Sequence, residues 1–260
     1  MKKLLTAVIT AILTIGACFS FASCKDEKKP TEIGIGDGKL VIGYTIYKPM
    51  NYFDENNKFV GFDTDLAVAV CDYLKVDYEF KEIVWKNKVM SLNSKEIDVV
   101  WNGMTITDEL QNAMSITESY LQNKQVIVCK VADAEKFSES ADKKGLAGYE
   151  VFVETGSAGE STAKDLSITP TGVSAQKDTL LNVKTGSKSV AIIDKLMADV
   201  LVGEGSANPD LTYVDVNFPI EYFGIGCRKN DIVTTVAIEA AINALKADGT
   251  FDALIEKYFG

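Results

Sequence analysis

Two short stretches of the chain combine residue types that bind the charged groups of small molecules. Asp194 directly follows the apolar run Val190–Ile193, so we expect its carboxylate at the end of a buried strand, where open α/β sheets bind ligands. Its alternative role is to cap the helix expected from Lys195. Gly156–Ala158 stands between an expected strand and an expected helix, where free N–H groups and the helix dipole favour an anion. The first stretch therefore suits a cation and the second an anion.

The composition excludes several other kinds of chemistry. Histidine is absent, which removes the commonest general base and a main zinc ligand. Beyond Cys18 and Cys24, the widely spaced thiols Cys71, Cys129 and Cys227 match no metal motif, and we expect buried free thiols. The 27 Lys and Arg against 37 Asp and Glu give a net charge of −10, which disfavours nucleic acid. We therefore expect no cofactor, no metal and no nucleic-acid partner.

The elements that would position these residues alternate between strands and helices. In the first part we expect strands and helices in this order: strand 39–44, a hairpin over 53–59, a helix from Phe62, strand 78–83, helix 86–94 and strand 98–101. This alternation predicts a mostly parallel sheet with helices on both faces. Asp63 and Asp65 fit the positive start of the helix that begins at Phe62.

The middle of the chain repeats the alternation in a second unit. Its expected elements are a β-rich run 125–131, a polar helical segment 132–148, strand 150–154, helix 156–166, and strands 190–193 and 211–214. Another β-rich run, 222–228, returns towards two terminal helices. We expect Ile232, Val236, Ala240, Ala244 and Leu245 to share one face of the first, and Thr250 to cap the second. Two α/β units joined by two β-rich segments predict a cleft between two lobes.

The N-terminus predicts export. Met1–Lys3 is basic, Leu4–Cys18 is apolar but shorter than a membrane-spanning helix, and Phe21–Ser23 precedes Cys24. This order resembles a bacterial lipobox, which implies a signal peptide over 1–23, a diacylglycerol group on Cys24 and attachment to the bacterial cell membrane. The alternative is an ordinary secretory signal in which Cys24 is incidental. Residues 24–37 are polar and predict a flexible tether.

Three longer segments carry a resemblance to a known family. Gly61–Leu74 fits the signature of family-3 extracellular solute-binding proteins, Gly103–Glu109 resembles the ligand loop of that family, and Asp248–Gly260 resembles its C-terminal end. The chain is thus similar to polar amino-acid-binding proteins of ABC importers. The resemblance implies the type II periplasmic-binding-protein fold, an α/β fold of two lobes joined by two crossing strands. It places lobe 1 at 38–126 and 222–260, and lobe 2 at 127–221.

The resemblance also assigns residues of the first lobe to a ligand site. Tyr47 and Trp85 match the two aromatic residues that enclose the ligand, and their π-faces suit a cation. The alternative for each is a core aromatic residue, which without the family is the favoured role for Trp85. Tyr47 precedes a proline loop and so fits a site better on its own residues. Gly103 and Thr105 match the loop whose backbone N–H and hydroxyl hold the α-carboxylate, because Gly permits close approach and Thr adds a donor. A plain turn after a strand is the alternative.

The second lobe supplies the remaining expected contacts. Ser157 and Ala158 match its carboxylate-binding turn, with Ala158 offering only a backbone donor. Asp194 matches the acid that pairs with the ligand's α-ammonium. Glu154 occupies a position that helps to select the side chain, and an acid there suggests a cationic or amide side chain. Its alternative is a solvated carboxylate at the end of a strand.

One position departs from the family pattern. Leu110 stands where the family usually has an arginine that grips the α-carboxylate, and the loss removes a charge-assisted pair. Either another cationic side chain binds the ligand's α-carboxylate, with Lys124 and Lys86 as candidates, or neutral hydrogen-bond donors bind it. The third possibility is a ligand that is not a standard α-amino acid. Arg228, the chain's sole arginine, is expected to be exposed.

These observations predict a monomeric, lipid-anchored, extracytoplasmic receptor that captures a polar amino acid by lobe closure and delivers it to an ABC permease. An enzyme on the same fold is a rival, since some cyclic-acid dehydratases share it. No pair of nucleophile and base is evident in the sequence, so we expect no catalysis. The ligand-sensing part of a receptor is a second rival, which would need a further membrane span or signalling domain.

Overall fold

The structure, a computed structural model, describes residue 35 and residues 38–137 and 145–260. The expected signal peptide, Cys24 and all of the expected tether except residue 35 lie outside the described residues. In the part that is described, no helix has both the length and the apolar character required to cross a membrane.

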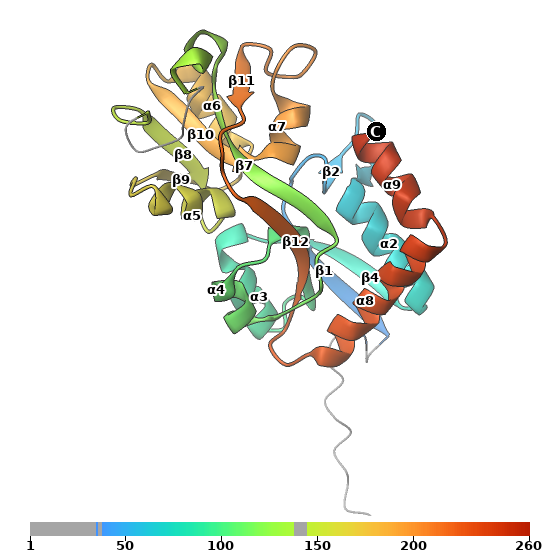
Figure 1. Cartoon of the computed structure of the whole chain (residues 1–260). Helices are drawn as coiled ribbons and strands as arrows, with labels where there is room; N and C mark the ends of the chain where they lie inside the picture. The colour runs from blue at the N-terminus through green and yellow to red at the C-terminus, as the bar shows by residue number, and fades with distance from the viewer. Residues whose placement is uncertain (1–34, 36–37, 138–144) are drawn as a thin grey trace, which may run out of the picture. The chain divides into compact units, whose positions relative to one another are not determined.

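The first lobe contains a parallel group of three strands. Strand β1 pairs in parallel with both β4 and β5, as the alternation of the sequence predicts. The lobe consists of β1 (Lys39–Tyr44), β2 (Tyr52–Phe53), β3 (Phe59–Val60), α2 (Phe62–Leu74), β4 (Asp77–Glu82), the 3₁₀ turn η2 (Trp85–Asn87), α3 (Lys88–Asn93), β5 (Val99–Thr105), α4 (Asp108–Ala113), β6 (Ser115–Ile116), α8 (Ile232–Ala247) and α9 (Thr250–Phe259). Figure 1 shows α2, α8 and α9 together on one side of these strands.

The second lobe repeats this design with its own strands. Strand β8 pairs in parallel with β9 and with β10. The lobe consists of the 3₁₀ helix η3 (Val131–Phe137), β8 (Glu150–Glu154), α5 (Ala158–Asp165), β9 (Thr171–Val173), α6 (Asp178–Thr185), β10 (Ser189–Asp194), α7 (Lys195–Leu201) and β11 (Leu211–Val214). The buried side chains of β10 explain why Val190–Ile193 is uniformly apolar, since both faces of the strand are covered.

Two long strands run between the lobes, side by side in Figure 1. They are β7 (Leu121–Lys130) and β12 (Ile220–Cys227), which pair antiparallel from Leu121 to Lys124. From Gln125 onwards β7 pairs instead with β10 of the second lobe, with Asp194 opposite Gln125. The partner change at Lys124 and Gln125 therefore brings residues of both lobes and both crossing strands together.

The start of α2 shows why the long family-like segment has its sequence. Gly61 has φ 140°, and a Cβ there would lie 2.1 Å from the carbonyl oxygen of Met50. Phe62 and Leu66 are fully buried at helical spacing. Asp65 accepts hydrogen bonds from the Tyr258 hydroxyl at 2.6 Å and the Lys257 ammonium at 2.7 Å. These contacts fasten the C-terminal helix to α2.

Several expected elements differ from the structure. Strand β7 begins at Leu121 rather than 125, and the described part of 132–148 forms only the short η3, with 138–144 outside the described residues. Ile232 and Val236 are exposed on α8, whose buried face contains Thr234, Ile238 and Leu245. Apolar residues occur on nearly every side of this helix, so its packing against α2 and β12 determines which side is buried. Thr250 does not cap α9, because Gly249 in the left-handed region is the N-cap residue.

Candidate functional site

One cavity between the lobes is lined by all eight residues that the sequence assigns to a ligand site. We call it the inner cavity, and its volume is about 20 Å³. Its lining residues are Tyr47, Trp85, Asn102, Gly103, Thr105, Glu154, Ser157, Ala158, Gln176 and Asp194. The first five come from the first lobe and the last five from the second, so the cavity exists only where the lobes meet.

Asp194 ends β10 and is held on both carboxylate oxygens. Gln176 donates to Oδ2 at 2.6 Å, while Gln125 at 2.9 Å and Asn123 donate to Oδ1. Burial raises the pKa of Asp194, and these hydrogen bonds oppose the rise. Asp194 is the N-cap residue of α7, but its side chain makes no capping hydrogen bond. The alternative role of Asp194 as a helix cap is therefore wrong.

A second carboxylate, that of Glu221 on β12, lies beside Asp194. Its Oε2 accepts from Gln125 Nε2 at 2.9 Å, from Thr105 Oγ1 at 3.1 Å and from Asn123 Nδ2 at 3.3 Å. Burial, and then the negative charge of Asp194, raises the pKa of Glu221 to about 7. The amides of Asn123 and Gln125 thus connect two carboxylates at the crossing strands.

Glu154 gives the lining of the inner cavity a second acid beside Asp194. Glu154 is only 5% exposed, and its Oε1 atom is buried without a hydrogen-bond partner. Burial and the nearby charge of Asp194 raise its pKa to about 8, while the charge of Lys88 lowers it. A buried carboxylate oxygen without a donor is costly unless a ligand supplies one. The alternative, a solvated carboxylate at the strand end, is therefore wrong.

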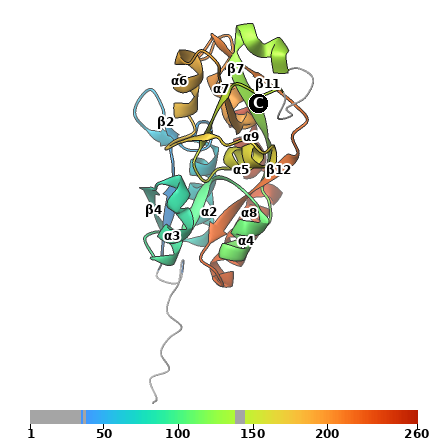
Figure 2. The ribbon, with the colours of Figure 1, turned by 90° about the vertical axis from the view of Figure 1, so that its left-hand side faces the viewer.

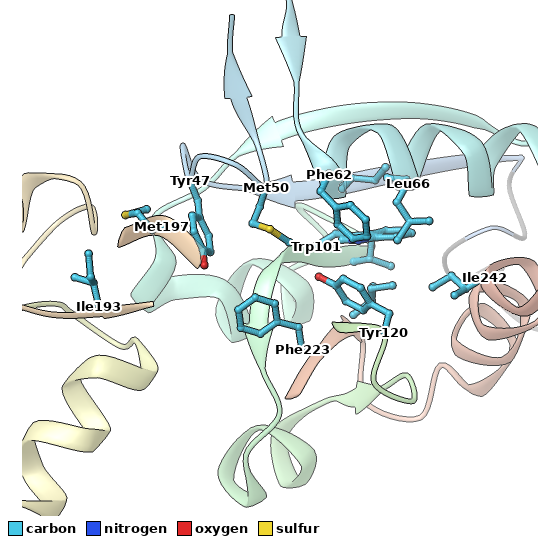
Figure 3. Packing of buried hydrophobic residues seen from close by; sticks show 14 of the residues in the cluster. Tyr47, Met50, Phe62, Leu66, Trp101, Tyr120, Ile193, Met197, Phe223 and Ile242 are labelled. Carbon is cyan, nitrogen blue, oxygen red and sulfur yellow. The ribbon is translucent and has the colours of Figure 1, made fainter. Parts of the chain in front are cut away.

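Tyr47 and Trp85 are buried and also line the inner cavity, so their core and site roles are not exclusive. In Figure 3 Tyr47 stands between the packed side chains of the first lobe and Ile193 and Met197 of the second. Gly103, at φ +56°, lies against this ring, and a Cβ there would be 2.7 Å from Tyr47 Cε1. The close approach explains the glycine.

The backbone of Gly103 has a different role from the expected one. Its N–H donates to Asp63 Oδ2 at 2.6 Å, so in this structure it is engaged within the protein rather than turned to a ligand carboxylate. Asp63 also accepts from the Tyr120 hydroxyl at 2.8 Å, and burial raises the pKa of Asp63 to about 7. Asp63 therefore joins the backbone of Gly103 to the first turn of α2.

The turn before α5 keeps fewer free donors than expected. The Gly156 N–H donates to Glu160 Oε2 at 2.6 Å, and the Ser157 N–H donates to the Glu154 carbonyl at 3.2 Å. Ser157 Oγ accepts from the Glu160 N–H, which caps the helix. Of the three backbone donors in Gly156–Ala158, that of Ala158 is the one without a hydrogen bond inside the described chain.

A larger cavity of about 230 Å³ adjoins the inner one, and we call it the outer cavity. It shares Trp85, Thr105, Ser157 and Ala158 with the inner cavity, and Leu110 also lines it. In the turned view of Figure 2, α5 stands on the side of the second lobe that faces α3 and α4. The outer cavity lies among these helices, with residues from each of them in its wall.

The structure shows which of the cationic side chains considered for the ligand carboxylate lie near the cavities. Lys124 pairs with Asp215 and lines neither cavity, whereas Lys86 is exposed and lines the outer one. Arg228 is not exposed as expected; it is 8% exposed and pairs with Asp98 at 2.6 Å. The buried cation at the cavities is Lys88, which the sequence did not single out. Lys88 lies three residues after Trp85 and two after Lys86, but nothing in the sequence marked its side chain as buried.

Gln176 is a lining residue of the inner cavity that the sequence did not indicate as part of a site. Gln176 lies in an irregular segment before α6 and makes two hydrogen bonds with Asp194. Asn102 accepts from the Thr45 N–H at 2.9 Å and from Asn51 Nδ2 at 2.8 Å, which fixes the start of the ligand loop. Within the described residues, no group of three or more His, Cys, Asp or Glu side chains is arranged to bind a metal. Cys71, Cys129 and Cys227 are buried free thiols, as predicted.

The chain matches several known proteins over nearly its whole length. The L-arginine-binding protein of Pseudomonas aeruginosa is 28% identical, over 100% of this chain and 97% of that protein. A substrate-binding protein of Streptococcus pneumoniae, solved with bound histidine, is 26% identical with a TM-score of 0.78, covering 86% of this chain and 93% of that one.

A third similar structure is an ancestral amino acid-binding protein described as a precursor of cyclohexadienyl dehydratase. It is 28% identical with a TM-score of 0.77, covering 87% of this chain and 97% of its own. The sequence model of one family, the bacterial extracellular solute-binding proteins, family 3, matches residues 40–260. The two-lobed fold and this match show that the chain belongs to the family-3 bacterial extracellular solute-binding proteins.

Proposed function

We propose that this protein binds a polar amino acid with a cationic or amide side chain outside the cytoplasm and delivers it to an ABC permease. One observation carries the choice of side chain: Glu154 Oε1 is buried at the cavity wall without a donor. A guanidinium, ammonium or amide group of a ligand supplies such a donor.

Asp194 is the proposed partner of the ligand's α-ammonium. Three side-chain amides already orient its carboxylate and keep it in the cavity. Tyr47 and Trp85 would enclose the aliphatic part and favour positive charge through their π-faces. The Ser157 hydroxyl and the free N–H of Ala158 are the proposed donors for the α-carboxylate, with Gly103 shaping the loop. Thr105 would join them by exchanging its hydrogen bond to Glu221 for one to the ligand. The site is thus acidic at one end and rich in donors at the other.

The names of the relatives support this ligand class. The protein from Pseudomonas is named for L-arginine, and the structure from Streptococcus contains histidine. Because Leu110 removes the usual arginine, an amino-acid-like solute with an altered carboxylate is the alternative ligand.

Binding would proceed by closure of the lobes. The proposed lobes are 38–126 with 222–260, and 127–221, with the hinge where β7 changes partners. An inner cavity of about 20 Å³ has room for about one water, so an amino acid requires the lobes to separate before it enters. Small-angle scattering should show a smaller radius of gyration with ligand, and unchanged dimensions would contradict the hinge.

The proposed cellular setting is attachment to the membrane through lipid on Cys24, as a monomer, after removal of residues 1–23. Intact-mass measurement of the membrane fraction should show a diacylglycerol adduct that Cys24→Ala abolishes. A soluble protein of unaltered cysteine mass would favour the ordinary secretory signal.

The ancestral neighbour described as a precursor of a dehydratase favours an enzyme as the second candidate. Thermal-shift and calorimetric titration of the purified protein against the common amino acids separates the two. A ligand at 100 times its dissociation constant stabilises the folded protein by about 2.7 kcal/mol. Stoichiometric binding with the ligand recovered intact supports a receptor, whereas release of a changed product would support the enzyme.

A further inference from the structure

Lys88 is a buried lysine at the junction of the lobes. It is the first residue of α3 and is only 5% exposed. Its Nζ donates to the carbonyl oxygen of Gly156 in the second lobe at 2.9 Å, and lies 4.5 Å from the centre of the Trp85 ring. An ammonium has three donors, and the described contacts use one of them in a hydrogen bond.

The surroundings of Lys88 do not neutralise it by a direct ion pair. Glu154, Glu109 and Glu160 are the acids whose charges reach it, but none lies within 4.0 Å among the ion pairs of the described residues. Glu160 pairs instead with Lys164 at 2.8 Å. Burial lowers the pKa of Lys88 to about 8. A cation in this position is therefore short of a close anionic partner.

The position of Lys88 relates it to the missing arginine. Lys88 and Leu110 both line the outer cavity, which also contains Thr105 and the turn at Ser157 and Ala158. A ligand whose ammonium contacts Asp194 and whose chain packs on Trp85 would direct its carboxylate towards these donors. The cationic side chain that borders this region and is itself buried is that of Lys88.

We propose that Lys88 binds the α-carboxylate of the ligand in place of the arginine that Leu110 replaces. This inference rests on the proposed function, since it presumes an amino-acid ligand. On binding, the ligand carboxylate would accept a second hydrogen bond from the Lys88 ammonium, which already donates to the Gly156 carbonyl of the second lobe. Lys88 would thus also link ligand capture to lobe closure.

The test compares amino acids with their carboxamides, which lack the negative charge. L-arginine, L-lysine, L-histidine and L-glutamine, each with its carboxamide, would be titrated into the full-length protein and into Lys88→Met. Lys86→Met is the matched control, because Lys86 lines the same cavity but is exposed. Lys88→Gln serves as a second variant if Lys88→Met does not fold.

We expect Lys88→Met to weaken binding of the amino acid about 10- to 100-fold and to leave the carboxamide nearly unchanged, which corresponds to the loss of one charge-assisted contact. Lys86→Met should keep the affinity of the unaltered protein. Recovery of the preference in Lys88→Met with Leu110→Arg would place both side chains at the same carboxylate.

Equal losses for acid and carboxamide, or no loss for either, would overturn the role of Lys88 while leaving the proposed function intact. Failure of the unaltered protein to bind any of the four amino acids would overturn the proposed function and this inference with it.

Discussion

Gln176 and Asp194 exchange two hydrogen bonds. The amide nitrogen Nε2 of Gln176 donates to Asp194 Oδ2 at 2.6 Å, and the backbone N–H of Asp194 donates to Gln176 Oε1 at 3.0 Å. The pair joins the segment before α6 to the end of β10, and both residues line the inner cavity. Gln176 therefore fixes the direction of a carboxylate that lies at the end of a strand.

Gln176→Leu should weaken ligand binding about tenfold or more, because Asp194 loses a hydrogen bond that orients it, and a bond to a charged group is worth about 1.5–3 kcal/mol. Isothermal titration measures the change. Gln122→Leu, an exposed position on β7, is the control and should bind normally. Unchanged affinity in Gln176→Leu would contradict a role for Asp194 in holding the ligand.

Glu154→Gln should weaken a ligand with a cationic side chain far more than a neutral one, because the buried carboxylate loses its charge. The pH dependence follows from the pKa of about 8. Below that pH the free protein holds Glu154 protonated, and a cation favours the ionised form, so binding at pH 7 should release close to one proton.

Calorimetry of Glu154→Gln and the unaltered protein in two buffers of different ionisation enthalpy counts this proton. The charges of Asp194, Lys88 and Asp178 also act on Glu154 and are common to both proteins. Equal proton release from both, or equal loss of affinity for cationic and neutral ligands, would remove Glu154 as the selector of the side chain.

Gly103→Ala should lower both stability and ligand affinity, because the new methyl group would lie 2.7 Å from the Tyr47 ring and the backbone has φ +56°. Gly205→Ala is the matched control, since Gly205 also has a positive φ but no atom within 4 Å of its Cβ. Thermal unfolding and ligand titration of the two variants separate backbone strain from the clash. Equal behaviour of both variants would show that Tyr47 tolerates displacement.

Arg228→Gln should destabilise the fold by about 3–5 kcal/mol, the usual cost of breaking a buried ion pair, and leave ligand affinity unchanged. Its guanidinium donates to Asp98 and to the carbonyl of Ile97, and it lines neither cavity. Urea unfolding measures the loss, and Lys229→Gln, at an exposed neighbour, is the control. Loss of binding without loss of stability would contradict this structural role and make Arg228 a candidate ligand contact.

The sequence by itself determined the fold class, the order of strands and helices in the first lobe, and the eight residues that meet at the inner cavity. Apolar runs and helical spacing predict the elements, because buried strands and helix faces are made of apolar residues. The segment from Phe62 to Leu74 illustrates this, since its helix with a buried face was predicted from the spacing of its apolar residues. The eight residues came from the resemblance of short segments to the family-3 solute-binding proteins.

Only the tertiary structure decided which groups surround those residues. Lys88, Gln176 and Glu221 come from distant parts of the sequence. Only the packing of the lobes places Lys88 at the outer cavity, Gln176 at the inner cavity and Glu221 beside Asp194. The burial of Arg228, the unpaired oxygen of Glu154 and the engagement of the Gly103 N–H likewise depend on neighbours from distant segments. The local sequence specifies the helix or strand to which a side chain belongs. Its burial and its hydrogen-bond partners depend on segments that only the folded chain brings near.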